Sequence, residues 1–268
     1  MPETLRITGL TKRFGVVTAV DGFTADIPPG QFVGVIGPSG AGTSTLLRFI
    51  NRLVEPDGGT IRHGAIDVTA LHGKPLRHWR ARAAMIFQQF NLIPRLDVLT
   101  NVLVGRLEQR PALPSLFGLF RASDRADALL ALDRFGLADV ALQRAGTLSG
   151  GQQQRVAICR ALLQNPWLML ADEPIASLDP HNARLVMQAL RQVNRDHGLT
   201  VLANLHHLDE VRTYCDRVIA MRAGRIVLDG TPADLTPERV FDIYGVTEEE
   251  LEAVDHAPPP LHSTAAHA

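Results

Sequence analysis

The sequence predicts an α/β fold: a core sheet flanked by helices, an antiparallel β subdomain and an inserted α-helical subdomain. Three observations support this prediction. An apolar run at 32–36 leads through a glycine-rich loop into an apolar helix at 46–50, which gives the order strand, loop, helix. A second apolar run, at 167–171, ends in two carboxylates. From about 90 to 146 the strand signals give way to helical ones.

Size and composition are those of a protein that buries a core. The chain has 268 residues, 46% hydrophobic and 21% charged, with a net charge of −1. This balance argues against a nucleic-acid-binding protein. No window has the ~18–20 apolar residues of a spanning helix, and residues 1–7 lack the apolar core of a signal peptide. We therefore expect a cytosolic protein with two free thiols, Cys159 and Cys215, that reaches a membrane only through a partner.

The first third of the chain alternates β-like runs with turn signals. Residues 5–10 and 16–27 predict strands before the run at 32–36, and 59–69 predicts another pair. Phe14 lies in the polar stretch 12–15. There it fits either a structural turn or an aromatic ring that stacks on a base.

The loop after the run at 32–36 has the glycine spacing of a phosphate-binding P-loop. Glycines let backbone N–H groups turn toward an anion, and the following helix adds the positive end of its dipole. The pattern G-x-x-x-x-G-K-[ST] requires lysine where this chain has threonine. The loop therefore has the glycines that let backbone N–H groups bind phosphate, but it lacks the positively charged lysine. It comprises Gly37, Pro38, Ser39, Gly40, Ala41, Gly42, Thr43, Ser44 and Thr45.

The middle of the chain predicts helices at 98–107 and 124–135, the second with Ser123 as N-cap, after a short buried strand at 84–87. The apolar loop at 111–120 is open to three interpretations: packing within a subdomain, docking of a partner, or contact with a membrane surface.

Two later helices begin with clear caps. Ser149 is a natural N-cap for a helix that runs to Leu163, and the glycines after it leave N–H groups open to a ligand. Asp179 caps, and Pro180 begins, a helix that stops at Gly198. Glycine before a helix is common, so the Ser-Gly-Gly segment alone identifies no site.

The carboxylates after the run at 167–171 are Asp172 and Glu173. Buried charge must be paired or metal-bound, and ligands of open α/β sheets bind at the carboxyl ends of strands. We therefore expect both to be functional. A strand at 200–203 leads to His206 and His207, and residues 217–228 predict a hairpin.

After short helices up to Gly245, residues 246–268 form a tail that is too polar and proline-rich to bury a core, and we expect it to be disordered. The histidines in this tail, His256, His262 and His267, lack ligand spacing, so no metal site is expected there.

In this order, these motifs resemble the ATP-binding subunit of ABC transporters. The resemblance covers residues 1–245 and rests on the P-loop, Gln88, Leu-Ser-Gly-Gly-Gln at 148–152, Asp172-Glu173, Ser177-Leu178-Asp179 and His206. It implies a P-loop NTPase (RecA-like) core at 1–89 and 160–235 with a helical subdomain at about 90–159. It also implies a peripheral protein at the cytoplasmic face of the cell membrane.

The resemblance assigns ligands to individual residues. Phe14 would stack on adenine, and the loop 37–45 would wrap the phosphates of ATP. Ser44 and Gln88 would bind Mg²⁺, with Asp172 holding it through water.

It also assigns roles in catalysis and assembly. Glu173 would polarise the attacking water, His206 would contact the γ-phosphate, and Gln88 would pass motion to a membrane permease. Residues that would meet ATP bound to a second, identical subunit are Ser149, Gly150, Gly151, Gln152 and Asp179.

A narrower resemblance, to phosphonate-importer ATPases, rests on 87–93, 98–107, 115–120, 148–155 and 204–206. It implies an energy-coupling subunit that serves a permease and a periplasmic or surface substrate-binding protein. An amino-acid importer ATPase, which shares much of the segment 87–92, is the alternative. A soluble ABC protein acting on ribosomes or DNA is disfavoured by the single cassette and the near-neutral charge.

Thr43 adds a third alternative, a nucleotide-binding scaffold that does not turn over. Losing one preorganised donor slows a reaction by roughly 10²–10³, and losing the P-loop cation is expected to slow it at least as much. Since Glu173 and His206 are intact, the sequence favours a recent or deliberate substitution, or a slow enzyme, over an old pseudoenzyme.

Overall fold

The computed structural model describes residues 3–88, 90–109, 120–176, 178–247 and 250. Their strands form a six-stranded sheet, β10-β9-β3-β8-β7-β6, and a four-stranded sheet, β2-β1-β4-β5. In the larger sheet β9, β3, β8, β7 and β6 are parallel and β10 joins antiparallel. All pairs in the smaller sheet are antiparallel. The predicted α/β fold with an antiparallel β subdomain is confirmed.

The described strands are β1 Leu5–Phe14, β2 Val17–Ile27, β3 Phe32–Ile36, β4 Gly58–His63, β5 Ile66–Asp67, β6 Ala83–Ile86, β7 Leu168–Asp172, β8 Thr200–Asn204, β9 Arg217–Arg222 and β10 Arg225–Gly230. The described α-helices are α1 Thr43–Ile50, α2 Gly73–Arg82, α3 Val98–Leu103, α5 Ala122–Arg134, α6 Gly150–Leu163, α7 Pro180–His197, α8 Leu208–Tyr214 and α9 Pro237–Tyr244. Short 3₁₀ turns are η1 Val104–Gln109, η2 Ala138–Val140, η3 Ala145–Thr147 and η4 Pro232–Asp234.

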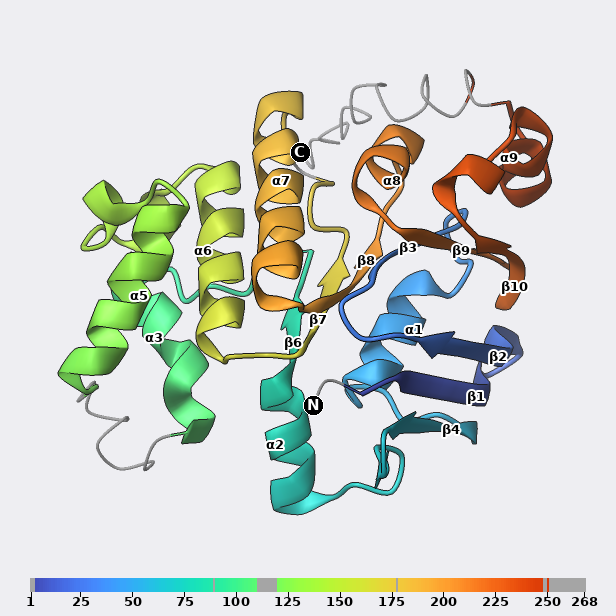
Figure 1. Ribbon diagram of the computed structural model, residues 1–268, viewed down its shortest axis with the longest axis horizontal. Helices are drawn as coiled ribbons and strands as arrows, with labels where there is room; N and C mark the ends of the chain where they lie inside the picture. Colours follow the sequence, from blue (N-terminus) through green and yellow to red (C-terminus); the bar gives the residue numbers. More distant parts are fainter. Residues whose placement is uncertain (1–2, 89, 110–119, 177, 248–249, 251–268) are drawn as a thin grey trace, which may run out of the picture.

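The six-stranded sheet has a buried core on each face because its side chains alternate. In β7, Leu168 and Leu170 face α1 and the smaller sheet, whereas Met169 and Ala171 face α6 and α7. The same alternation in β3 places Val33 and Val35 on the α1 side. Helix α1 is thus enclosed between the two sheets (Figure 1). This burial fixes the helix that follows the glycine loop.

A group of helices lies beside this core. Helices α3, α5 and α6 pack on one another, and α6 also contacts α7. Figure 1 shows the group at the left, on the far side of α7 from the four-stranded sheet. Among the helices that the structure describes, none combines the length and apolarity needed to span a bilayer. Cys159 and Cys215 are free and buried, as expected.

Two expectations about the helices were wrong, and one helix was not predicted. Helix α2 was not foreseen, because its one buried residue, Trp79, gives no apolar stripe. Helix α5 begins at Ala122, since the Asp124 carboxylate accepts the N–H of Arg121 and so caps the helix two residues earlier than Ser123 would. The helix expected at 98–107 stays α-helical only to Leu103 and continues as 3₁₀.

Strand β1 is longer than expected and ends at Phe14, which pairs with Val17 instead of lying in the turn. The expectations for Gln89, Ser177, the loop segment 111–119 and the tail from 251 lie outside the described residues.

Candidate functional site

The carboxyl ends of the parallel strands β3, β8, β7 and β6 lie at one edge of the larger sheet. The glycine loop follows β3, and Asp172 and Asn204 are the last residues of β7 and β8, paired across the two strands. Gln88 follows β6. The topology therefore gathers residues from four distant parts of the chain.

The glycine loop is shaped by contacts that exclude side chains. A Cβ on Gly42, whose φ is +99°, would lie 2.0 Å from the Ala19 carbonyl oxygen, and one on Gly37 would lie 2.3 Å from that of Met221. The loop is closed by the Ala41 N–H, which donates to the Pro38 carbonyl at 2.9 Å. Helix α1 starts directly after Gly42, which caps it without a side chain. Its first N–H groups are therefore available to an anion.

Thr43 occupies the first position of α1 and is 7% exposed. Its hydroxyl stops near its own Cβ, and residues 37–47 contain no Lys, Arg or His. The one cation of α1, Arg48, lies a turn further along, with Nη2 3.5 Å from Asp172 Oδ2. The loop thus provides backbone donors and no charge of its own.

Three polar side chains converge where α1 meets β7 and β8. Asn204 Nδ2 donates to Ser44 Oγ at 3.2 Å and to Asp172 Oδ1 at 3.1 Å. Asp172 is 3% and Asn204 1% exposed. Asn204 was not singled out from the sequence, although a polar residue ending an apolar strand is the signal that identified Asp172.

Glu173 lies between two further side chains. Its Oε2 accepts a hydrogen bond from Gln88 Nε2 at 2.7 Å, and its Oε1 lies 3.1 Å from His206 Nε2. Its φ of +51° is unusual for a residue with a side chain. A pocket of about 110 Å³ is lined by Glu173, Asn204 and His206, among others. The structure thus brings together Gln88, Glu173 and His206, the expected catalytic residues, and two of them, Glu173 and His206, line this pocket.

The segment after Gln88 is fastened to α6. Phe90 and Asn91 both have positive φ, and their carbonyls accept hydrogen bonds from the two Nη atoms of Arg160, at 2.7 and 2.6 Å. Burial lowers the pKa of this guanidinium. Arg160 was missed because its partners are backbone carbonyls, which a sequence pattern does not reveal.

The two expected caps are confirmed. Ser149 Oγ accepts the N–H of Gln152, whose side chain accepts the N–H of Ser149 in return. Asp179 Oδ1 accepts the N–H groups of His181 and Asn182. The Asn182 side-chain amide, with these N–H groups, holds the pKa of the Asp179 carboxyl below its usual range.

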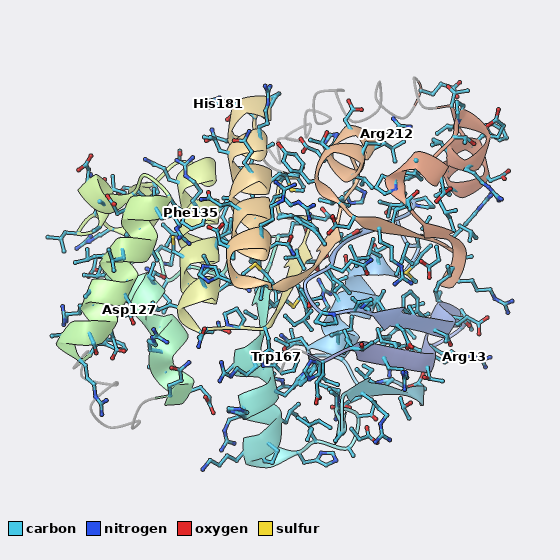
Figure 2. All side chains as sticks on the ribbon, in the orientation of Figure 1. Arg13, Asp127, Phe135, Trp167, His181 and Arg212 are labelled. Carbon is cyan, nitrogen blue, oxygen red and sulfur yellow. The ribbon has the colours of Figure 1, made fainter. Side chains whose placement is uncertain are left out.

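The N-termini of α6 and α7 lie side by side, since a Cβ on Gly151 would lie 2.6 Å from Asn182 Cγ. His181 marks the N-terminal end of α7 in Figure 2. Trp167, directly before β7, lies toward the C-terminal end of α7 in the same view. Ser149, Gly150 and Asp179 are exposed. Within the described chain, no hydrogen bond or ion pair joins the segment 149–152 to the glycine loop.

Phe14 is half exposed at the end of β1, with Lys12 Nζ 5.5 Å from the centre of its ring. It belongs to neither buried core. The position suits a ring that offers a face to a ligand, and the structure does not join it to the polar groups around Asp172.

The oxygen atoms of Ser44 and Asp172 are suitable ligands for a magnesium ion. Mg²⁺ prefers oxygen ligands and keeps several of its waters, so a protein needs to supply only one or two carboxylates or hydroxyls. Ser44 Oγ and the Asp172 carboxylate, joined through Asn204, are such oxygens. The described residues contain no cluster of three or more His, Cys, Asp or Glu that would favour another metal.

Comparison with known proteins agrees with this geometry. The sequence profile of the ABC transporter family matches residues 20–176. A phosphonates import ATP-binding protein PhnC of Rhizobium etli is 58% identical over 92% of this chain and 87% of its own. One of Rhodopseudomonas palustris is 59% identical over 95% of each.

A solved structure is also similar: the ATP-binding cassette MJ0796, a dimer in a post-hydrolysis state bound to ADP and Pi. It has 33% identity and a TM-score of 0.75, over 85% of this chain and 98% of that one. The family profile matches more than half of the chain, and the two import proteins are 58–59% identical to it over nearly all of its length. Together these matches show which family the chain belongs to. This chain belongs to the ABC transporter family, among its ATP-binding subunits.

Proposed function

We propose that this chain is the energy-coupling ATPase subunit of a phosphonate importer. The observation that carries the proposal is the convergence of Ser44, Asp172, Glu173 and His206 on one edge of the sheet. The substrate class comes from relatives at 58–59% identity that are named phosphonates import ATP-binding proteins.

In this proposal the glycine loop binds the phosphates of ATP. The N–H groups at the start of α1 face the anion, and Ser44 and Gln88 would bind Mg²⁺, with Asp172 holding it through water. Bound Mg²⁺ supplies positive charge to the β- and γ-phosphates. Phe14, exposed at the end of β1, stacks on the adenine.

Glu173 orients and polarises the attacking water. Gln88 and His206 hold one oxygen each of its carboxylate, so the group is fixed before water arrives. His206 also contacts the γ-phosphate. Because Gln88 begins the segment that Arg160 fastens to α6, a change at the γ-phosphate reaches the helical subdomain through it.

A second copy of the chain completes each site. Ser149, Gly150 and Asp179 are exposed at helix ends, and among the described residues no bond joins the segment 149–152 to its own glycine loop, which suits contact with ATP held by a partner. The helical subdomain, about 90–159, faces the permease at the cytoplasmic side of the membrane, and a substrate-binding protein delivers the phosphonate. The subdomain boundary at 159 falls inside α6, so this helix would transmit motion between the two parts.

One observation favours a second candidate, a nucleotide-binding scaffold that does not hydrolyse ATP. Thr43 leaves the loop without its cation. The intact Gln88–Glu173–His206 arrangement favours a slow enzyme instead, since nothing in a non-hydrolysing scaffold requires it.

The complex with its permease, reconstituted in lipid vesicles, tests the proposal. We expect ATP hydrolysis to rise when a binding protein loaded with an aminoalkylphosphonate is supplied, and to stay at its basal rate with one loaded with an amino acid. If only the binding protein loaded with an amino acid stimulated hydrolysis, the chain would instead be the ATPase subunit of an amino-acid importer. ATP binding without hydrolysis in either case would favour the scaffold.

A further inference from the structure

Four asparagines of the described chain are buried: Asn51, Asn101, Asn194 and Asn204, at 4%, 0%, 3% and 1% exposure. The Asn51 amide donates to the Ala83 carbonyl. Two of them use both ends of the amide within the fold. Asn101 donates to three carbonyls and accepts the N–H of Ile93. Asn194 donates to the Gly30 and Leu199 carbonyls and accepts from Arg191. Both are placed as structural residues.

Asn204 differs from Asn101 and Asn194 in the partners of its amide donors and in the state of its amide oxygen. Its two Nδ2 donors go to side chains, Ser44 Oγ and Asp172 Oδ1. Its Oδ1 is buried and has no hydrogen-bond partner among the described residues. A buried acceptor without a partner is unfavourable, so this side chain is poorly suited to stabilising the fold.

The chemistry of the two acceptors explains the choice of residue. Residue 204 must donate twice, to groups on α1 and β7, while adding no charge beside Asp172. An amide has two N–H donors on one atom and is neutral. A carboxylate at this position would donate nothing and would repel Asp172, and an aliphatic side chain would leave both oxygens without a partner.

We infer that Asn204 is a positioning residue for the metal–nucleotide site: it holds Ser44 Oγ and the Asp172 carboxylate together before the metal binds. The inference rests on the proposed function, because both groups are proposed to hold magnesium, Ser44 directly and Asp172 through water. Partners that orient metal ligands typically contribute 10–100-fold to metal affinity. Arg48, on the other oxygen of Asp172, is half exposed and free to leave it, whereas Asn204 is enclosed.

The test compares Asn204→Leu with Asn194→Leu, each made in the unmodified chain and in a Thr43→Lys background. Binding of a fluorescent ATP analogue is titrated with Mn²⁺, and bound Mn²⁺ is counted by EPR. We expect Asn204→Leu to raise the half-saturating Mn²⁺ concentration about 10–100-fold, with unchanged nucleotide affinity in EDTA and a smaller fall in Tm than in Asn194→Leu. Asn194→Leu should lower Tm and leave the half-saturating concentration unchanged.

Equal half-saturating concentrations for Asn204→Leu and its parent, with nucleotide bound by both, would overturn this inference and leave the proposed function standing. Failure of the unmodified chain and of Thr43→Lys to bind nucleotide at all would overturn both. A Tm loss in Asn204→Leu as large as in Asn194→Leu, without a metal effect, would assign Asn204 a structural role.

Discussion

Gln88 Nε2 donates to Glu173 Oε2 at 2.7 Å, which ties the end of β6 to the residue after β7. His206 Nε2 approaches the other carboxylate oxygen at 3.1 Å. These contacts join three segments that are far apart in the sequence, and they hold Glu173 in a backbone conformation with positive φ. The carboxylate is thus oriented by the fold itself.

Replacing this carboxylate tests its role as the base. Glu173→Gln keeps the size of the side chain and removes the charge that polarises water. In a Thr43→Lys background we expect phosphate release to fall about 10²–10⁴-fold, the range for loss of a general base, with ATP affinity retained. Asp209→Asn, at an exposed position of α8, is the control and should keep the parent rate. A fall of less than threefold in Glu173→Gln would remove Glu173 from catalysis.

Mixing two variants tests whether the sites are shared between subunits. One chain carries Thr43→Lys with Ser149→Arg, and the other is unmodified. Alone, the first pairs an intact loop with a blocked α6 end, and the second pairs the threonine loop with an intact Ser149. In a mixed dimer, one site combines the Thr43→Lys loop with the unmodified Ser149, so we expect phosphate release well above the mean of the separate samples.

Mixing without gain would show that each chain completes its own site. The control is a mixture in which both chains carry Ser149→Arg, since it has no intact α6 end. Loss of the Ser149 cap is expected to lower stability by about 1 kcal/mol, so folding of each chain is checked by its thermal unfolding before mixing.

The ion pair between Arg191 and Asp216 makes stability depend on pH. Asp216 accepts two hydrogen bonds from Arg191, at 2.6 and 2.9 Å, and a third from the Phe32 N–H at 2.9 Å. The Arg191 side chain is the main cause that lowers the pKa of Asp216 below its ordinary 3.8. Since the folded-state pKa is the lower one, the stabilisation is complete above about pH 4 to 5 and is lost as the pH falls through the folded-state pKa.

We therefore expect Asp216→Asn to lower the free energy of unfolding by about 1–2 kcal/mol at pH 7. The lower end is expected because the Asp216 side chain is 38% exposed and water screens the pair. The difference should shrink as pH falls below 4, as measured by urea unfolding. Asp21→Asn removes an exposed pair with Arg225 and should change stability by less than about 0.5 kcal/mol. A difference that persists at low pH would exclude this ion pair as its source.

Local chemistry explains how much of the fold could be predicted. Ser149 and Asp179 were predicted as caps because a short polar side chain before a helix bonds the next N–H groups. Gly198 ends α7 in the left-handed conformation that favours glycine. The strands of the core were recognised because continuous apolar runs mark strands buried on both faces.

The missed features depend on contacts distant in sequence or on competition between neighbours. Helix α2 is held by Trp79, which donates to the Ile50 carbonyl, and not by an apolar stripe. At the start of α5, Asp124 competes with Ser123 for the capping role. Asn204 and Arg160 take their meaning from partners on other elements. A sequence pattern cannot supply those partners.

The most direct test compares the unmodified chain with Thr43→Lys. The rate of phosphate release and the ATP affinity of each chain show whether this site is an ATPase that lacks one cation. We expect both chains to bind ATP and Thr43→Lys to turn over at least about 10²-fold faster, because the lysine restores positive charge at the phosphates. Equal inactivity of two chains that both bind ATP would contradict the ATPase and leave the scaffold.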